Sequence, residues 1–473
     1  MKIVFCSSEV VPFVKTGGLA DVAGALPLVL ERLGLEIIIV MPLYKGIETK
    51  KFGIRRFNDF SATTQIGKNI KVFFINHEEY FNRDGLYGDK TGDFPDNLER
   101  FQYYCSKTLA LLKALKIQPD ILHCHDWQTA LIPVYLKVLY QNDHFFEQTK
   151  TLFTIHNLAY QGVFPKSEFP KLRLPKNLFS IDGFEFYDQV NLLKAGILYC
   201  DCITTVSPMY SKEIQTQEKG CGLDGVLRSR CDKVVGILNG LDYDFWNPQT
   251  DQAIVKNFSE GDFKGKRENK TCLKEYFHLP EKEDTPLLGF VGRLTSQKGI
   301  DLIYQAVDEI GKLDLQMILL GTGEEKYHKI LKEMNHRFPK RIAVHLKFDE
   351  KMAHQIYAGS DIFLMPSQYE PCGLSQMISL RYGTIPLVFQ TGGLKDTIFP
   401  FDSDGKKGNG FVFTEYNKNA FMEAIKKAVQ TYKNKKVFAE LFHQAFTYRF
   451  TWEDSAQKYM KVYERSLALA KVR

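Results

Sequence analysis

Residues 2–41 read KIVFCSSEVVPFVKTGGLADVAGALPLVLERLGLEIIIVM. The apolar run at residues 2–7 has the length and composition of a buried parallel strand. A loop follows, and apolar residues then recur at helical spacing until Gly34 stops the pattern. Pro27 lies inside this helix, where we expect a kink or a local break. Residues 36–41 form a second strand, so the segment predicts the strand–loop–helix–strand start of a doubly wound sheet.

The loop in this segment contains a short phrase that occurs twice in the chain. It reads Lys15-Thr16-Gly17-Gly18-Leu19-Ala20-Asp21 first and Thr391-Gly392-Gly393-Leu394-Lys395-Asp396 later. Paired glycines let backbone N–H groups come close to a ligand, because no Cβ blocks the approach. Placed between a strand and a helix, such a loop suits phosphate. Two copies predict two halves of similar build that face one charged ligand. Gln390 replaces the lysine in the second copy, so we expect the first copy to reach the chemistry.

Strands and helices continue to alternate in two series along the chain. Expected strands lie at residues 71–76, 120–125, 151–155, 202–206 and 234–238, and again at 286–291, 315–320, 342–346, 362–365 and 385–389; expected helices lie at 98–115, 299–310 and 452–470. We therefore predict an α/β protein with two Rossmann-like, doubly wound parallel-sheet domains that face a central cleft, at residues 1–243 and 244–450. A C-terminal helix at residues 451–473 is expected to pack back on the first domain.

The bulk composition fits an ordinary globular protein. The chain has 473 residues, 44% of them hydrophobic and 25% charged, with a net charge of +6. This small charge does not indicate nucleic-acid binding. The basic clusters at residues 264–270 and 433–436 lack interleaved aromatic residues and are predicted to be solvated surface. We expect no signal peptide and no membrane span, because no apolar stretch approaches the required length.

Neither the cysteines nor the histidines form a convincing metal site. Nine cysteines at irregular spacing are expected to be free thiols in a reducing cytoplasm. The group with the closest spacing has no paired C-x-x-C pattern: Cys200, Cys202, Cys221 and Cys231. His123 and His125 form an H-x-H pair, but no third ligand stands at a supporting distance. We expect neither a metal nor another cofactor.

Two cations follow the first strand of the second series. Arg293 and Lys298 enclose the loop Leu294-Thr295-Ser296-Gln297. A forked guanidinium and a compact ammonium at the carboxyl end of a strand suit a diphosphate. They would stabilise the negative charge that develops on a departing phosphate. The alternative is an arginine and a lysine that bracket a surface turn.

A second candidate loop reads Glu370-Pro371-Cys372-Gly373-Leu374-Ser375. Its backbone is placed to donate N–H groups at the start of the next helix, and Glu370 is placed to accept hydrogen bonds from a sugar hydroxyl. The alternative is a helix cap. His156 ends a strand of the first series, where it is either a catalytic residue or a structural hydrogen-bonding residue.

Taken in order, these motifs resemble the bacterial glycogen synthases and plant starch synthases from residue 1 to about residue 452. The matching segments are Lys15 to Val22, His125-Asp126-Trp127, Thr154-Ile155-His156-Asn157, Arg293 with Lys298, Glu370 to Leu374 and Thr391 to Leu394. The resemblance implies a retaining glycosyltransferase of the GT-B type. It implies an enzyme that transfers glucose from ADP-glucose to the non-reducing end of an α-1,4-glucan such as glycogen, as a 4-α-glucosyltransferase without a metal.

The resemblance also implies a role for each matching residue. The catalytic set would be Glu370, Arg293, Lys298 and His156. The donor-binding set would be Lys15, Gly17, Gly18, Asn239, Phe348, Cys372, Gly373, Leu374 and Ser375. The acceptor-binding set would be Asp21, Asp126 and Trp127. Phe348 stands where the family often has a tyrosine that stacks on adenine, and Ser375 stands where threonine is common.

The motif around Glu370 contains no second carboxylate, whereas retaining glycosidases place two about 5 Å apart. We therefore expect displacement on one face of the sugar, with the departing phosphate taking the proton of the acceptor.

Three alternative functions stay open. One is a related GT-B enzyme with a UDP or GDP donor, such as a sucrose synthase or a mannosyltransferase. The others are a glucan-binding protein without activity and a sugar-nucleotide epimerase. The sequence indicates no oligomeric state.

Overall fold

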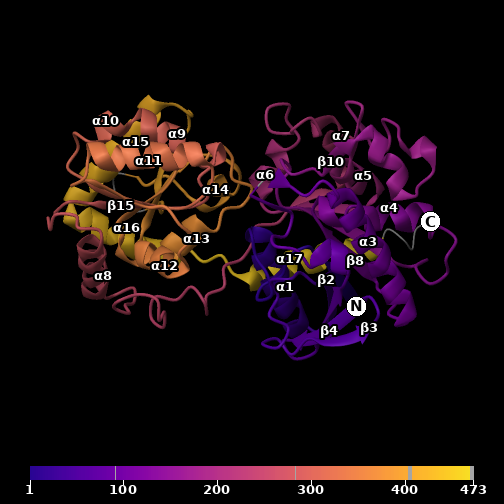
Figure 1. The fold of residues 1–473 in the computed structure, drawn as a ribbon. Coiled ribbons are helices and arrows are strands. Elements are labelled where there is room, and N and C mark those ends of the chain that lie inside the picture. The colour runs from indigo at the N-terminus through magenta and orange to yellow at the C-terminus, as the bar shows by residue number, and fades with distance from the viewer. Residues whose placement is uncertain (91, 283, 403–406, 469–473) are drawn as a thin grey trace. The chain divides into compact units, whose positions relative to one another are not determined.

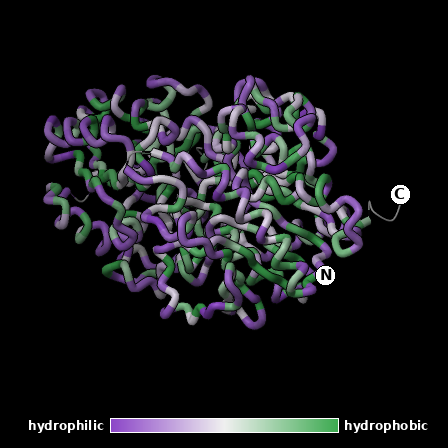
Figure 2. The backbone as a smooth tube through the Cα atoms, turned by 45° about the vertical axis from the view of Figure 1, so that its right-hand side comes forward, coloured by the Kyte–Doolittle hydropathy of each residue, from purple (hydrophilic) through white to green (hydrophobic). Residues whose placement is uncertain are grey.

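The computed structural model describes residues 1–90, 92–282, 284–402 and 407–468. The chain forms two compact units (Figure 1): unit 1 is Met1–Gly240 with Trp452–Arg473, and unit 2 is Leu241–Thr451. Each unit contains a mainly parallel sheet with helices packed against it. Many outer loops are hydrophilic, with hydrophobic stretches inside (Figure 2). The predicted α/β class with two doubly wound sheets is confirmed.

Unit 1 contains a nine-stranded sheet in the order β14-β13-β9-β8-β1-β2-β5-β4-β3. Its strands are β1 (Lys2–Cys6), β2 (Glu36–Pro42), β3 (Arg55–Asn58), β4 (Ser61–Ile66), β5 (Ile70–Ile75), β8 (Ile121–His125), β9 (Lys150–Ile155), β13 (Cys202–Thr205) and β14 (Val234–Gly236). The β3–β4 hairpin is antiparallel and was not predicted. Its strands are polar and partly exposed, so they lack the apolar run that marks the parallel strands.

Smaller strands and eight helices complete the described part of unit 1. The strands are β6 (Gly88–Asp89), β7 (Gly92–Asp93), β10 (Val163–Pro165), β11 (Glu185–Phe186) and β12 (Gln189–Asn191). The helices are α1 (Gly18–Arg32), α2 (Glu78–Phe81), α3 (Asn97–Ala114), α4 (Leu131–Val138), α5 (Leu192–Tyr199), α6 (Pro208–Glu213), α7 (Asp224–Arg228) and α17 (Trp452–Ala468). The last helix packs against α1 and β9; residues 469–473 of the predicted C-terminal helix lie outside the described residues.

Unit 2 contains a six-stranded parallel sheet in the order β17-β16-β15-β18-β19-β20. Its strands are β15 (Leu287–Val291), β16 (Gln316–Leu320), β17 (Ile342–His345), β18 (Ile362–Met365), β19 (Ile385–Phe389) and β20 (Phe411–Phe413). Its helices are α8 (Phe263–Tyr276), α9 (Ile300–Gln305), α10 (Val307–Ile310), α11 (Glu325–Arg337), α12 (Glu350–Gly359), α13 (Ser375–Arg381), α14 (Gly392–Thr397), α15 (Lys418–Lys433) and α16 (Lys435–Thr447).

Two details of the predicted helices differ from the structure. Helix α1 continues from Gly18 to Arg32 through Pro27, so of the expected kink or local break, the break is absent. The helix expected at residues 299–310 is divided into α9 and α10 at Ala306. The two glycine pairs do lead into helices, because α1 begins at Gly18 and α14 begins at Gly392.

Among the parallel strands, the order reverses once in each sheet. In unit 2 the reversal lies between β15 and β18, and in unit 1 it lies between β1 and β8. At such a point the loops after the two neighbouring strands diverge and leave a crevice at the carboxyl ends, where open α/β sheets bind their ligands. The fold therefore directs attention to the loops that follow these four strands.

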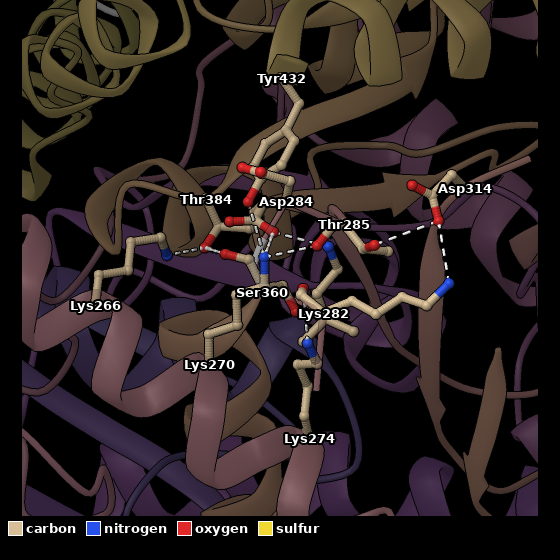
Figure 3. Close-up of polar contacts among 12 residues, drawn as sticks. Lys266, Lys270, Lys274, Lys282, Asp284, Thr285, Asp314, Ser360, Thr384 and Tyr432 are labelled. Carbon is tan, nitrogen blue, oxygen red and sulfur yellow. Dashed lines mark hydrogen bonds and ion pairs between the residues drawn. The ribbon is translucent and has the colours of Figure 1, made fainter. Parts of the chain in front are cut away.

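The basic cluster at residues 264–270 on α8 is only partly the solvated surface that the sequence predicted, because Lys264 and Arg267 are exposed but Lys266 and Lys270 are not. Lys266, Lys270 and Lys274 are buried at four-residue spacing along the helix (Figure 3). The Nζ of Lys266 donates to the carbonyls of Ala358 and Tyr382, at 3.0 and 2.9 Å. A buried ammonium is stable only where such acceptors surround it, so these lysines fasten α8 to the ends of neighbouring elements.

Candidate active site

A buried ion pair connects the two loops at the strand-order reversal of unit 2. Lys298 lies in the short 3₁₀ turn after β15, and Glu370 lies in the loop after β18. Lys298 Nζ is 2.6 Å from Glu370 Oε2, and the two side chains are only 18% and 9% exposed. Since β15 and β18 are neighbours in the sheet, the fold itself brings this cation and this carboxylate together.

Hydrogen bonds to backbone carbonyls also join the same two loops. Gln297 Nε2 donates to the carbonyl of Tyr369 at 3.1 Å, and Gln368 N donates to the carbonyl of Gln297 at 2.9 Å. Gly299 has a φ of +74°, and a Cβ there would lie 2.0 Å from the carbonyl oxygen of Pro366. Only glycine permits this approach, so the two loops can pack directly against each other.

The second glycine pair supports the Glu370 loop from behind. Gly393 N donates to the carbonyl of Glu370 at 3.0 Å. A Cβ on Gly393 would lie 2.0 Å from the carbonyl oxygen of Cys372. The hydroxyl of Ser375 accepts a hydrogen bond from Tyr357 at 2.9 Å, which holds its side chain against α12. The second copy is therefore a structural contact, in keeping with its missing lysine.

The other residues predicted for the donor in unit 2 differ in exposure. Arg293 is exposed and precedes Lys298 in the loop after β15. Phe348 is 82% exposed and follows β17, so its ring presents an open face. Cys372 is buried, whereas Gly373 and Leu374 are partly exposed in the loop that leads into α13.

In unit 1 the first glycine pair follows β1, next to the strand-order reversal. Lys15 Nζ lies 2.8 Å from Asp21 Oδ1, so these two predicted site residues form an ion pair at the start of α1. No described atom lies within 4 Å of a Cβ built on Gly17 or Gly18. Packing within the protein therefore does not require glycine at either position. The close approach of a ligand would explain both glycines.

A carboxylate that the sequence analysis did not single out holds this loop. Glu9 is buried and accepts hydrogen bonds from the backbone N–H of Thr16 and, at 3.3 Å, from that of Gly17. It also accepts from the hydroxyls of Thr16 and Tyr87, at 2.6 and 2.7 Å. The N–H of Gly17, one of the two glycine N–H groups expected to meet phosphate, is therefore already engaged, and Glu9 fixes the loop. A lone acid between two apolar stretches was the only signal for it.

The loops after β8 and β9 place Asp126 and His156. Asp126 has a φ of +55°, an uncommon conformation for a residue with a side chain. Its Oδ1 accepts the backbone N–H of His156 at 2.7 Å. Burial raises the pKa of Asp126 to about 7 and lowers that of His156 to about 3. The histidine is therefore neutral at pH 7, and Asp126 determines the position of its backbone.

Two further predicted residues of unit 1 are buried. Trp127 packs edge-on against Phe101 and Phe164, and Gly162 lies so close that a Cβ there would meet the indole at 2.5 Å. Asn239 follows β14, and its Oδ1 is buried without a hydrogen-bond partner among the described residues. An unsatisfied buried amide oxygen is costly, which fits a group that acquires a partner on ligand binding.

Neither pattern considered for a metal forms a cluster. Among the described residues, no group of three or more histidine, cysteine, aspartate or glutamate side chains could hold a metal ion. His123 and His125 instead bond to protein side chains, and all nine cysteines are free. None of the helices in the described ranges is both long and apolar enough to cross a membrane.

Two family models match the chain, one in each half. The starch synthase catalytic domain matches residues 2–229, and glycosyl transferases group 1 matches residues 274–441. The chain is 48% identical to a glycogen synthase of Geotalea daltonii, with 99% of each chain covered. It is 43% identical to a glycogen synthase of Thermotoga maritima at the same coverage.

This chain belongs to the glycogen synthase family. The fold agrees, since the catalytic domain of starch synthase IV from Arabidopsis thaliana, bound to ADP and acarbose, matches with a TM-score of 0.90 at 34% identity and 99% coverage of both chains. A sucrose-phosphate synthase from Thermosynechococcus elongatus matches with a TM-score of 0.61 at 16% identity, which shows the shared fold alone. As a member of this family with the GT-B fold, the protein is a glycosyltransferase, and the family implies a nucleotide-sugar donor and a glucan acceptor.

The two glycine pairs give a matched test of this geometry. Gly18→Ala adds a methyl group in open space at the start of α1, so the free energy of unfolding is expected to stay unchanged or rise by about 0.5–1 kcal/mol. The KM for the donor is expected to rise about tenfold, because the methyl occupies ligand space. Gly393→Ala is the control and is expected to lower stability by about 1–3 kcal/mol. Denaturant unfolding and steady-state kinetics measure both; an unchanged KM for Gly18→Ala would contradict the assignment.

Proposed function

We propose that this protein transfers glucose from ADP-glucose to the non-reducing end of an α-1,4-glucan such as glycogen, with retention of the anomeric configuration. The observation that supports this most strongly is the Lys298–Glu370 pair at the strand-order reversal of unit 2. A cation and a carboxylate at this place suit a ligand that carries both phosphate and sugar hydroxyls. The adenine nucleotide is proposed from the family, one member of which is described as bound to ADP.

Unit 2 is proposed as the donor side. Glu370 compensates the charge of Lys298, and Arg293 provides a second cation for the diphosphate. Lys298 then contacts the diphosphate while it keeps Glu370 in place to accept hydrogen bonds from glucose. Phe348 stacks on the adenine through its exposed ring. The backbone from Cys372 to Ser375 completes the donor contacts.

Unit 1 is proposed as the acceptor side, with some donor contacts of its own. Lys15 and the backbone N–H of Gly18 reach the donor phosphate and sugar, Gly17 lets the ligand approach while Glu9 holds its N–H, and His156 and Asn239 reach the sugar. Asp21 and Trp127 lie on the acceptor side. Asp126 contributes through the backbone of His156, which it holds. We also propose a cytoplasmic location, which the nine free cysteines support.

The proposed reaction is a displacement on one face of the sugar. The acceptor hydroxyl attacks the anomeric carbon as the bond to the diphosphate breaks, and the departing phosphate oxygen takes the proton of that hydroxyl. Glu370 is bound to an ammonium, which suits a hydrogen-bonding residue better than a nucleophile. Arg293 and Lys298 stabilise the charge that develops on the leaving group, and exclusion of water by the bound substrates suppresses hydrolysis.

Incorporation of glucose into glycogen tests the proposed function. Labelled ADP-, UDP- and GDP-glucose are compared at equal concentration, with Glu370→Ala as the inactive control. We expect incorporation from ADP-glucose at the highest kcat/KM. Preference for UDP- or GDP-glucose would favour the related enzyme with another donor. Glycogen binding without incorporation would favour a binding protein, and donor consumption without an acceptor would favour an epimerase.

Two substitutions test the assignment of the diphosphate cations. Arg293→Ala and Lys298→Ala are each expected to lower kcat a few hundredfold, because one charge-stabilising donor is worth about 3 kcal/mol in a transition state. Lys329→Ala, an exposed lysine on α11, is the control and should keep the parent rate. Turnover within threefold of the parent for both site variants would remove these residues from the mechanism.

A further inference from the structure

Two buried histidines share a hydrogen bond in unit 1. His125 is the last residue of β8, and His156 follows β9, the neighbouring strand. His125 Nδ1 lies 2.9 Å from His156 Nε2. Burial lowers the pKa of His125 well below its ordinary value and that of His156 to about 3, so both rings are neutral at pH 7. A neutral imidazole carries one proton, and one of the two facing nitrogens must therefore donate to the other.

The remaining nitrogen of His125 decides the direction of this bond. His125 Nε2 is buried and has no hydrogen-bond partner within the described ranges. If His156 were the donor, His125 would carry its proton on Nε2, as a buried N–H without an acceptor. Buried N–H groups without a partner are rarer in proteins than under-satisfied acceptors. The favoured arrangement has His125 Nδ1–H as the donor and His156 Nε2 as the acceptor.

This direction fixes the proton of His156 on Nδ1. That nitrogen has no hydrogen-bond partner among the described residues, yet it is not a fully buried atom, so it is the ring nitrogen that can meet a ligand. The residue is also held on its other side, since its backbone N–H donates to Asp126. The backbone N–H and Nε2 of His156 are thus both bound to protein groups, and its Nδ1–H is available to donate to a ligand.

We propose that His125 is a positioning residue that presents His156 to the transferring sugar as an Nδ1–H donor. The identity of the sugar rests on the proposed function, whereas the direction of the His125–His156 bond does not. A donor fixed in advance requires a sugar hydroxyl to accept, and it needs no reorganisation when the ligand binds. No motif on either strand indicated this pairing.

His123 is a natural control on the same strand. It is buried like His125, but its Nδ1 lies 2.8 Å from the hydroxyl of Tyr463 and its Nε2 lies 2.7 Å from that of Thr154. Within the described residues it makes no hydrogen bond to His156, and it belongs to a separate chain that continues from Thr154 to Thr204. Its replacement should lower stability without changing the tautomer of His156.

Nitrogen NMR of the full chain labelled with ¹⁵N-histidine reads the tautomer directly. The His156 signals are assigned by their loss in His156→Gln. We expect a protonated Nδ1 and a bare Nε2 on His156 in the parent and in His123→Leu. A proton on His156 Nε2 in the parent would overturn the proposal. This spectrum needs no substrate, so it stands even if no nucleotide sugar supports glucose incorporation.

Kinetics then separate positioning from structure. His125→Leu removes the donor, and we expect it to release the tautomer of His156 and raise the KM for the donor sugar about tenfold, with a smaller change in kcat. His125→Asn places an amide nitrogen where Nδ1 stood and should recover most of the lost kcat/KM. Equal losses in both variants, or no loss in His125→Leu, would contradict a positioning role. If His125→Leu does not fold, the parent spectrum and His125→Asn decide.

Discussion

The buried contact between Lys298 and Glu370 is the interaction on which the candidate site depends. Each charge is costly to bury alone, and each is compensated by the other. The pair can form only because β15 and β18 are neighbours, and because Gly299 lets the two loops approach without a clash. The strand order of unit 2 thus determines which side chains meet. The remaining contacts around the pair, from Gln297 to Gly393, keep the two loops in that position.

In unit 1, too, buried carboxylates hold the loops at the carboxyl ends of the strands, but they bind backbone N–H groups and not a cation. Glu9 accepts from the backbone of the glycine loop after β1, and Asp126 accepts from the backbone of His156 after β9. Both acids are buried, and both fix backbone rather than stand ready as nucleophiles. With Glu370 bound to Lys298 and Asp21 bound to Lys15, all four of these acids are engaged with protein groups. This pattern agrees with a reaction in which the departing phosphate takes the proton.

Much of the architecture could be predicted from the sequence, because parallel strands are buried on both faces and appear as short apolar runs. The strands at residues 2–6 and 287–291 are clear examples. The β3–β4 hairpin could not be recognised in this way, since its residues are polar and partly exposed. The burial of the lysines on α8 was missed for the opposite reason. A basic run normally indicates solvent, and the carbonyls that satisfy Lys266 come from residues about ninety or more positions away.

The site was predicted residue by residue but not as a set of contacts. Motifs identified Lys298 and Glu370, yet the two are separated by 72 positions and only the sheet order brings them together. The same holds for His125 and His156, which belong to different motifs. Glu9 carried no motif at all. Partners of this kind depend on topology, which local patterns of residue type do not specify.

A double-mutant cycle on the central ion pair tests the account most directly. The kcat/KM for glucose incorporation is measured for Lys298→Met, Glu370→Gln and the double variant. If the two residues act as one unit, each single change already disables the pair. The kcat/KM of the double variant should then be no lower than that of the less active single variant. Losses that multiply in the double variant would contradict the account, because they would show that Lys298 and Glu370 act independently.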